Sequence, residues 1–307
     1  MASEHSKLLL KAYEEYLNHR DHCSNESPYL SYDFKFLNNK KWSLMAEKIV
    51  SNELRELTNL LNRWKSLLSK WRSWNLVLSN KDEMNAWHIR SEFVESIVNQ
   101  CLFYPSSMRD NFSSIATSSF HQIKLSLDRS YKDSLDEDSL KGGFLMRSKK
   151  EKQLKRLVSV FPESEIFLNL LKKLNNSQYV KDTLDYRNLA SHSIAPNLVL
   201  GETNFVTRTI EQATKMSLIG DNLCGPVGKT SVVYGFGGTP PINLEEAIKL
   251  NYEQYQIARE CYTVYLRILM ATVSTIENVA QSGSRRSLTS SPHTTHHAGP
   301  QWAVHLP

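Results

Sequence analysis

The sequence predicts an all-α protein. Apolar residues recur at steps of three and four from residue 54 to residue 74 and again over 244–278, as expected for one face of an amphipathic helix. The alternation of apolar and polar residues that marks a half-buried strand is scarce. Only the stretch SVVYGF at 231–236 is compatible with a short strand, and it is equally compatible with a loop. We therefore expect a bundle of helices.

The helices are expected at regular intervals along the chain. From residue 54, leucines and tryptophans share one side of a long helix, with Arg, Lys, Glu and Ser opposite. We therefore expect Trp64, Trp71 and Trp74 to pack in a core or an interface and not to stack on nucleic-acid bases. A break is expected near the Asn175–Asn176 pair. The other helices are predicted at 5–19, 83–103, 109–127, 163–194, 203–218 and 244–278.

Three stretches between or after these helices indicate how the chain is organised. The basic run KGGFLMRSKKEKQLKR lies in 141–160, which we expect to link an N-terminal helical region (1–140) to a C-terminal helical domain (161–280). Residues 220–241 are rich in turn-forming residues and long for a structureless loop, which indicates a functional or mobile segment. Residues 281–307 are polar and low in complexity, so we expect a disordered tail.

Composition limits the classes of function. The formal net charge of +5 over 307 residues permits an anionic partner without requiring one. His19, His22 and Cys23 lie close in NHRDHC, but a fourth ligand at suitable spacing is missing, so no metal site is expected. The N-terminus is too charged for a secretory signal and no apolar run reaches membrane-spanning length, so we expect a soluble, cytoplasmic protein without a membrane partner. Neither a disulfide framework nor zinc-knuckle spacing is indicated by the four cysteines, Cys23, Cys101, Cys224 and Cys261.

The stretch DYRNLASHS, residues 185–193, combines side chains that suit a site. On a helix, Asn188 and His192 are four apart and share a face, whereas Arg187 and His192 diverge by about 140° because they are five apart. Pro196 disfavours helical geometry at the residue before it, so the helix should end just past His192, where the macrodipole favours a protonated imidazole. Arg187 and His192 can still meet on one phosphate if the helix end loosens or if a second chain supplies the other half of the pocket.

The chemistry of this trio suits phosphodiester cleavage. Arg187 offers a permanently charged fork of donors to phosphate oxygens. An imidazole titrates near neutrality, so His192 can remove or deliver a proton at physiological pH. Asn188 can hold a phosphate oxygen or the imidazole. No carboxylate cage for magnesium lies nearby in the sequence, so cleavage here would use neither metal nor other cofactor, with the 2′-hydroxyl of RNA as nucleophile.

YRNLASHS resembles the signature of HEPN domains, all-α bundles that carry an Arg, an adjacent polar residue and a His after a gap of four to six residues. The resemblance covers roughly 160–280. It implies a metal-independent endoribonuclease of toxin or antiphage systems that acts on RNA as a homodimer, with an antitoxin or another regulatory protein as a further partner. It also implies that Arg187 contacts the scissile phosphate, that Asn188 is the adjacent polar residue, and that His192 is the acid–base group.

A non-catalytic function is the alternative. The looser Arg-to-His spacing occurs again at Arg286 and His293, in a tail that cannot form a helical site. Residues 187–192 are therefore also compatible with an exposed helix end that carries a solvated Arg. In that case the chain is a helical interaction or scaffold protein with a degenerate HEPN domain.

Lysines near the motif are candidates for contact with an RNA backbone. Lys149, Lys150 and Lys152 lie in the basic run, where a solvated face paired with the upstream acidic stretch DSLDED is the alternative. Lys229 follows the motif in GPVGKTS. That stretch departs from a phosphate-binding loop, because Leu223 stands where the pattern requires its first glycine.

Overall fold

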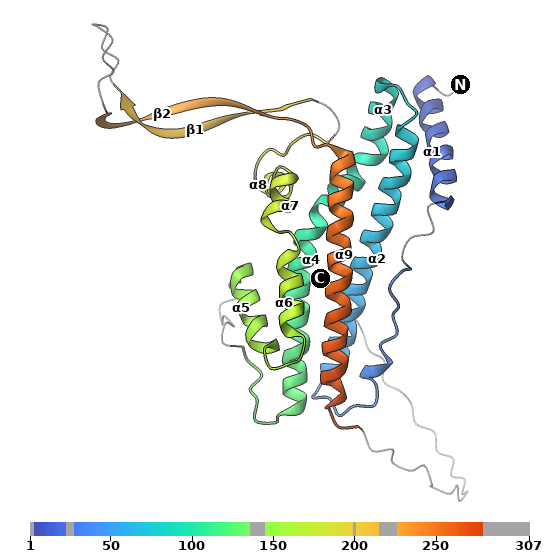
Figure 1. Cartoon of the computed structure of the whole chain (residues 1–307), viewed down its shortest axis with the longest axis vertical. Helices are drawn as coiled ribbons and strands as arrows, with labels where there is room; N and C mark the ends of the chain where they lie inside the picture. Colours follow the sequence, from blue (N-terminus) through green and yellow to red (C-terminus); the bar gives the residue numbers. More distant parts are fainter. Residues whose placement is uncertain (1–2, 23–27, 136–144, 199–200, 215–225, 279–307) are drawn as a thin grey trace, which may run out of the picture.

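Three long helices run side by side through the molecule, namely α2 (Ala46–Leu78), α4 (Glu95–Leu127) and α9 (Leu244–Ser274). Figure 1 shows the shorter helices around them and a two-stranded ribbon that projects from the end where α9 begins. The structure is a computed structural model, and it describes the chain except for residues 1–2, 23–27, 136–144, 199–200, 215–225 and 279–307. The predicted helical bundle is confirmed, and the ribbon is an addition to it.

The shorter elements cover the outside of this central layer. α1 lies along α2, α5 packs on α4, and α6 packs on α9 and α4. Their bounds are Glu4–His22 for α1, Glu83–Ile89 for α3, Arg147–Val158 for α5, Ser164–Lys173 for α6, Ser177–Asp182 for α7 and Tyr186–His192 for α8, with a 3-10 turn at Lys35–Leu37 and a π-helical turn at Arg90–Val94.

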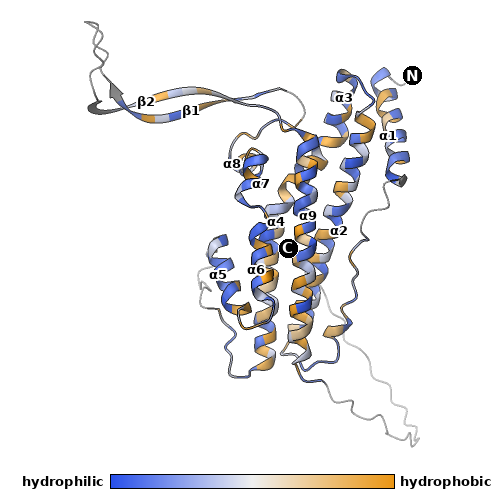
Figure 2. Cartoon of the chain, in the orientation of Figure 1, coloured by the Kyte–Doolittle hydropathy of each residue, from blue (hydrophilic) through white to orange (hydrophobic). Residues whose placement is uncertain are grey.

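The long helices bury the faces that the sequence spacing predicts. On α2 the side chains of Trp64 and Trp71 are fully buried and Trp74 is 3 % exposed, which confirms that the tryptophans belong to the core. Figure 2 shows that the long helices mix hydrophobic and hydrophilic residues, whereas α5 is largely hydrophilic. Burial of the apolar stripe, at about 25 cal/mol for each Å² removed from water, is what holds these amphipathic helices together.

Residues from both ends of the chain contribute to one hydrophobic core. The hydroxyl groups of Thr58 on α2 and Tyr262 on α9 form a buried hydrogen bond of 2.7 Å. The hydroxyl of Tyr265 on α9 donates to Oγ of Ser119 on α4 at 2.8 Å. The described parts of 1–140 and 161–280 therefore pack together around α9.

The break expected between 103 and 109 is absent, because α4 continues through Pro105. A proline inside a helix removes one backbone hydrogen bond and normally kinks or ends the helix. Here Pro105 is buried, and so are Leu102 and Met108 on the same stretch. Tertiary packing of these side chains compensates for the lost hydrogen bond, and the prediction of two separate helices was wrong on this point.

The helix predicted at 203–218 was also wrong, because this segment forms strand β1 (Thr203–Thr214). It pairs antiparallel with β2 (Pro226–Thr239), in register from Thr203 opposite Thr239 to Gln212 opposite Thr230. β1 is rich in Thr and includes Val206 and Ile210, and β2 contains Thr and three Val; these β-branched residues favour extended chain over helix. β2 includes the SVVYGF stretch and part of the loop expected at 220–241. The expected disordered tail at 281–307 lies outside the described residues.

The stretch expected as a basic linker contains α5, which is anchored on α4. Arg147 donates from Nε and Nη2 to the carboxylate of Asp110 at 2.6 and 2.7 Å, and Arg109 pairs with Glu151. Leu154, Leu157 and Val158 are buried beneath the helix. Further along, the predicted break is confirmed, since Asn175 has a φ of 48° and Asn176 caps α7 by accepting from the Tyr179 N–H at 2.8 Å.

Candidate functional site

A second break, which the sequence did not predict, separates α7 from α8. Leu184 and Asp185 both have left-handed backbone conformations, with φ values of 52° and 53°. The Asp185 N–H donates to the Val180 carbonyl at 2.7 Å, which closes the end of α7. A left-handed conformation costs a residue such as leucine about 1–2 kcal/mol. The break makes α8 a separate helix that starts at Tyr186, immediately before Arg187.

Tyr186 anchors α8 on α4. Its side chain is 6 % exposed, and its ring meets Phe103 edge to face with centroids 6.4 Å apart. The Tyr186 hydroxyl donates to Oδ1 of Asn99 at 3.1 Å. Burial raises the pKa of Tyr186 to about 12, so the phenol stays a neutral donor at physiological pH. A helix of this length does not persist alone in water, so its position depends on contacts such as these.

A short chain of hydrogen bonds orients Arg187. Its Nη1 donates to Oδ1 of Asn188 at 2.9 Å, and Nδ2 of Asn188 donates to Oδ1 of Asp185 at 2.7 Å. Asn188 is exposed and Arg187 half-buried. The Asn188 amide thus holds the guanidinium, and Asp185 holds the amide. Asp185 had no role in the sequence-based prediction, although an Asp just before a helix, three residues ahead of an Asn, is placed to make such a contact.

α8 stays helical up to His192, its last residue. This agrees with the end that Pro196 predicts. His192 is exposed. Since the helix does not loosen before His192, Arg187 and His192 lie about 7.5 Å apart along its axis and diverge by about 140° around it. Of the two ways in which they could meet on one phosphate, this geometry favours a second chain.

The ribbon is attached directly after α8. The Thr203 hydroxyl donates to the Ala195 carbonyl at 3.2 Å and accepts from the Asn197 N–H at 2.9 Å. The Ile242 N–H, beyond the other strand, donates to the Asn197 carbonyl at 3.0 Å. The base of the ribbon is therefore held to residues 195–197, the segment that follows α8, by the Thr203 hydroxyl and by one backbone hydrogen bond.

The predicted RNA-binding lysines of α5 lie further along the same face of α4. α8 contacts Asn99 and Phe103, and Arg147 of α5 contacts Ser106 and Asp110. These four residues of α4 follow at helical spacing, so the two contact points are separated by roughly 5–16 Å along the axis. Lys149 and Lys152 are exposed, and Lys150 is half-buried. Lys229 belongs to β2, and its side chain lies outside the described residues.

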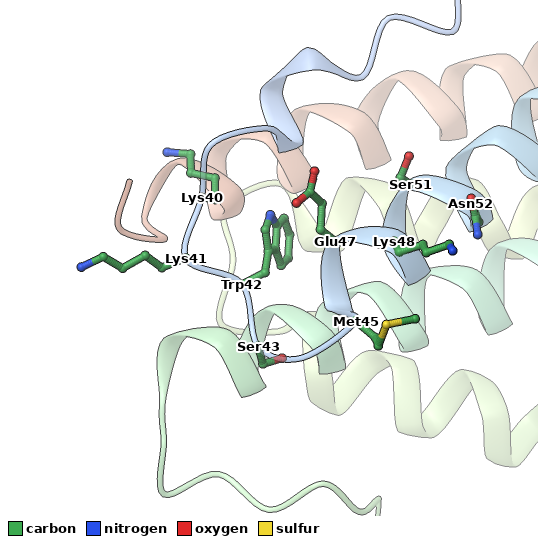
Figure 3. Close-up of a pocket in the computed structure, with 9 residues that line it drawn as sticks. All are labelled: Lys40, Lys41, Trp42, Ser43, Met45, Glu47, Lys48, Ser51 and Asn52. Atoms are coloured by element: carbon green, nitrogen blue, oxygen red, sulfur yellow. The ribbon is translucent and has the colours of Figure 1, made fainter. Parts of the chain in front are cut away.

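A hollow at the other end of the bundle does not form a comparable site. It has a volume of 690 Å³ and includes Trp42, Glu47 and Lys48 in its lining. Figure 3 shows the ammonium groups of Lys40 and Lys41 pointing away from Trp42 and from Lys48. Cations that diverge in this way do not gather around one anion. The residues of α8 thus remain the better candidates.

Two other findings concern the described residues alone. None of the helices they form combines the length and apolar character that crossing a membrane requires. No three His, Cys, Asp or Glu side chains among them gather in a group that could hold a metal ion.

Comparisons with family models, with curated proteins and with solved structures gave no match to the chain. The HEPN resemblance therefore stays a prediction carried by the motif and by the helical bundle around it.

Proposed function

We propose that the chain is a metal-independent endoribonuclease whose site is built from α8 of two copies, as the HEPN resemblance implies. The observation that carries this proposal is the presentation of Arg187 and His192 on one anchored, exposed helix. Asn188 orients the guanidinium, and the imidazole faces solvent. The two groups diverge on one α8, so Arg187 of one copy and His192 of the other act on the same phosphate.

The proposed reaction needs only the groups of the chain and of the RNA. The 2′-oxygen attacks the phosphorus and the bond to the 5′-oxygen breaks, which leaves a 2′,3′-cyclic phosphate and a 5′-hydroxyl. His192 takes the proton from the 2′-hydroxyl as a base and delivers it to the leaving 5′-oxygen as an acid. Arg187 stabilises the charge on the phosphorane, which is where most of the rate acceleration arises.

The lysines of α5 support substrate binding in this proposal. Lys149, Lys150 and Lys152 belong to α5, which packs on α4 beyond the contact of α8 and is anchored there by the ion pair of Arg147 with Asp110. Backbone phosphates bound there would extend from the α8 site along the bundle. Such contacts position RNA without reading its sequence, and their contribution weakens as salt is added.

The test is gel analysis of labelled total RNA with purified protein in excess chelator, beside Arg187→Ala and His192→Ala. We expect the parent to cut and both variants to leave RNA intact while unfolding at the parental urea concentration. Asn52→Ala, on the remote hollow, is a control expected to cut like the parent. If both α8 variants cut as fast as the parent, the proposed site is wrong.

A scaffold function is the second candidate, and the exposed apolar residues of the ribbon favour it. A scaffold would bind its partner through the ribbon and leave RNA intact. RNA that stays whole with parent and variants alike, under all salt conditions tried, supports this candidate over the ribonuclease.

A further inference from the structure

The two faces of the ribbon differ in character. Side chains of paired residues lie on the same face, and every second residue along a strand returns to it. The pairs Val206–Phe236, Arg208–Tyr234 and Ile210–Val232 thus share one face. The opposite face carries mostly Thr, Ser, Glu and glycine, together with Phe205 and Val233. We call the first the apolar face of the ribbon, formed by Val206, Ile210, Val232, Tyr234 and Phe236.

The side chains of the apolar face are largely exposed. Phe236 is 91 % exposed, Ile210 65 % and Tyr234 61 %. A whole aromatic side chain has an accessible surface of about 150–250 Å², and an aliphatic one has somewhat less. Multiplied by the exposed fractions, these areas give roughly 600 Å² of exposed surface for the five residues. A patch of that size marks an interaction surface. An isolated two-stranded ribbon is also marginally stable in water, so a covering layer would stabilise it.

We propose that the apolar face packs against the same face of a second copy of this chain, with the two-fold axis running along the ribbon. Stacking the two faces buries about 1,200 Å² in total, which reaches the range of specific protein interfaces. A protein surface that covers itself in this way forms a closed, symmetric dimer. Between Asn204 and Gln212 the face carries one charged residue, Arg208, which is paired across the ribbon with Tyr234.

The pairing of residues within the ribbon makes this arrangement complementary. Rotation about an axis along the strands places β1 of one copy over β2 of the other. Arg208 then lies over the partner's Tyr234, a cation–π contact, and Ile210 lies over the partner's Val232. Rotation about an axis across the strands would instead place Arg208 over the partner's Arg208, and like charges repel.

The position of α8 also favours the two-fold axis along the ribbon, an inference that rests on the proposed function. The ribbon base is hydrogen-bonded to Ala195 and Asn197, in the segment that follows α8. With the axis along the ribbon, both bundles lie at the same end and the two α8 helices are neighbours. With the axis across the ribbon centre, the two bases lie roughly 30 Å apart, at 3.3 Å per residue. Only the first arrangement keeps the two α8 helices at the same end of the dimer, as the proposed two-copy site requires.

Sedimentation equilibrium of the full chain at micromolar concentration tests whether two copies associate. We expect the parent, of 35.3 kDa per chain, to be a dimer. We expect the variants Phe236→Glu and Val232→Glu to be monomers. Phe236 is almost fully exposed in one chain, so its replacement leaves the monomer folded. Val233→Glu is the matched control, because Val233 lies next to Val232 but on the opposite face, and it should stay dimeric. A monomeric parent, or variants that dimerise like the parent, would overturn the proposal.

Cross-linking tests the axis in a background with Cys23 and Cys224 replaced by Ser. A short bis-maleimide should join Asn204→Cys of one copy to Asn204→Cys of the other, because an axis along the ribbon places this exposed residue of the ribbon base at the same level in both copies. An axis across the ribbon would instead place Asn204 near the partner's Gln212, so Asn204→Cys joined only to Gln212→Cys would refute the axis along the ribbon. These readings are masses, so they are independent of cleavage. A dimer that never cuts RNA rejects the proposed function alone, whereas a monomer that cuts RNA rejects the ribbon interface and the two-copy site but leaves the ribonuclease activity standing.

Discussion

Truncation of Tyr186 should free α8 from the bundle. Tyr186→Ala removes a ring that is 6 % exposed and the hydrogen bond to Asn99. Aromatic-to-Ala changes in cores cost about 3–5 kcal/mol, and we expect about 3 kcal/mol because α8 lies at the edge of the bundle. Tyr186→Phe keeps the ring and loses one hydrogen bond, so we expect about 1 kcal/mol.

Urea unfolding followed by circular dichroism measures both losses, and amide exchange localises them. The amides of α8 should exchange faster in Tyr186→Ala, while those of α2 and α9 keep their order of protection. Tyr32→Ala is the matched control, because Tyr32 is half exposed and donates one side-chain hydrogen bond at 2.8 Å, to Asn59. A loss for Tyr186→Ala no larger than for Tyr186→Phe would refute the role of the ring as an anchor.

Three further predictions test other parts of the structure. Burial raises the pKa of Glu53 in the folded chain above its ordinary value of 4.5. The protonated carboxyl therefore stabilises the fold fully below pH 4.5, and this stabilisation is lost as the pH rises through the pKa of the folded state. Glu53→Gln should unfold at a higher urea concentration than the parent at pH 7 but not below about pH 4. Gly237→Val should destabilise the ribbon by about 1–3 kcal/mol, seen as faster amide exchange in both strands, because a Cβ there would lie 2.8 Å from the Phe205 ring. Asp185→Ala should slow RNA cleavage about tenfold, because it releases the Asn188 amide that orients Arg187. Asp185→Asn keeps an acceptor oxygen and should retain most of the parental rate. Equal rates for the two variants would show that Asp185 has no role in the site.

The helical part of the fold followed from the sequence because its signals are local. The apolar stripe that contains Trp64 and Trp71 predicted both the helix and its buried face. The ribbon was missed because strand pairing is not local. Thr203–Thr214 forms β1 only through a partner that starts at Pro226, and no rule of spacing within either segment gives that register.

The residues of the candidate site and the C-terminal end of its helix could be predicted from the sequence, but the start of that helix could not. Pro196 gave the end of α8 at His192. The left-handed conformation of Leu184 could not be predicted, since leucine avoids it and only the surrounding structure enforces it. The contact of Asp185 with Asn188 depends on that break, and so does the start of α8 immediately before Arg187.

In the proposed function, the α8 helices of two copies together form one ribonuclease site. Mixing two inactive variants tests this arrangement. Arg187→Ala and His192→Ala are unfolded together, refolded as a mixture and assayed for RNA cleavage in excess chelator. About half of the randomly paired dimers are mixed, and in each of these one of the two sites is complete, so we expect about a quarter of the parental rate. Mixed dimers that form but leave RNA intact, or an inactive parent, would contradict it.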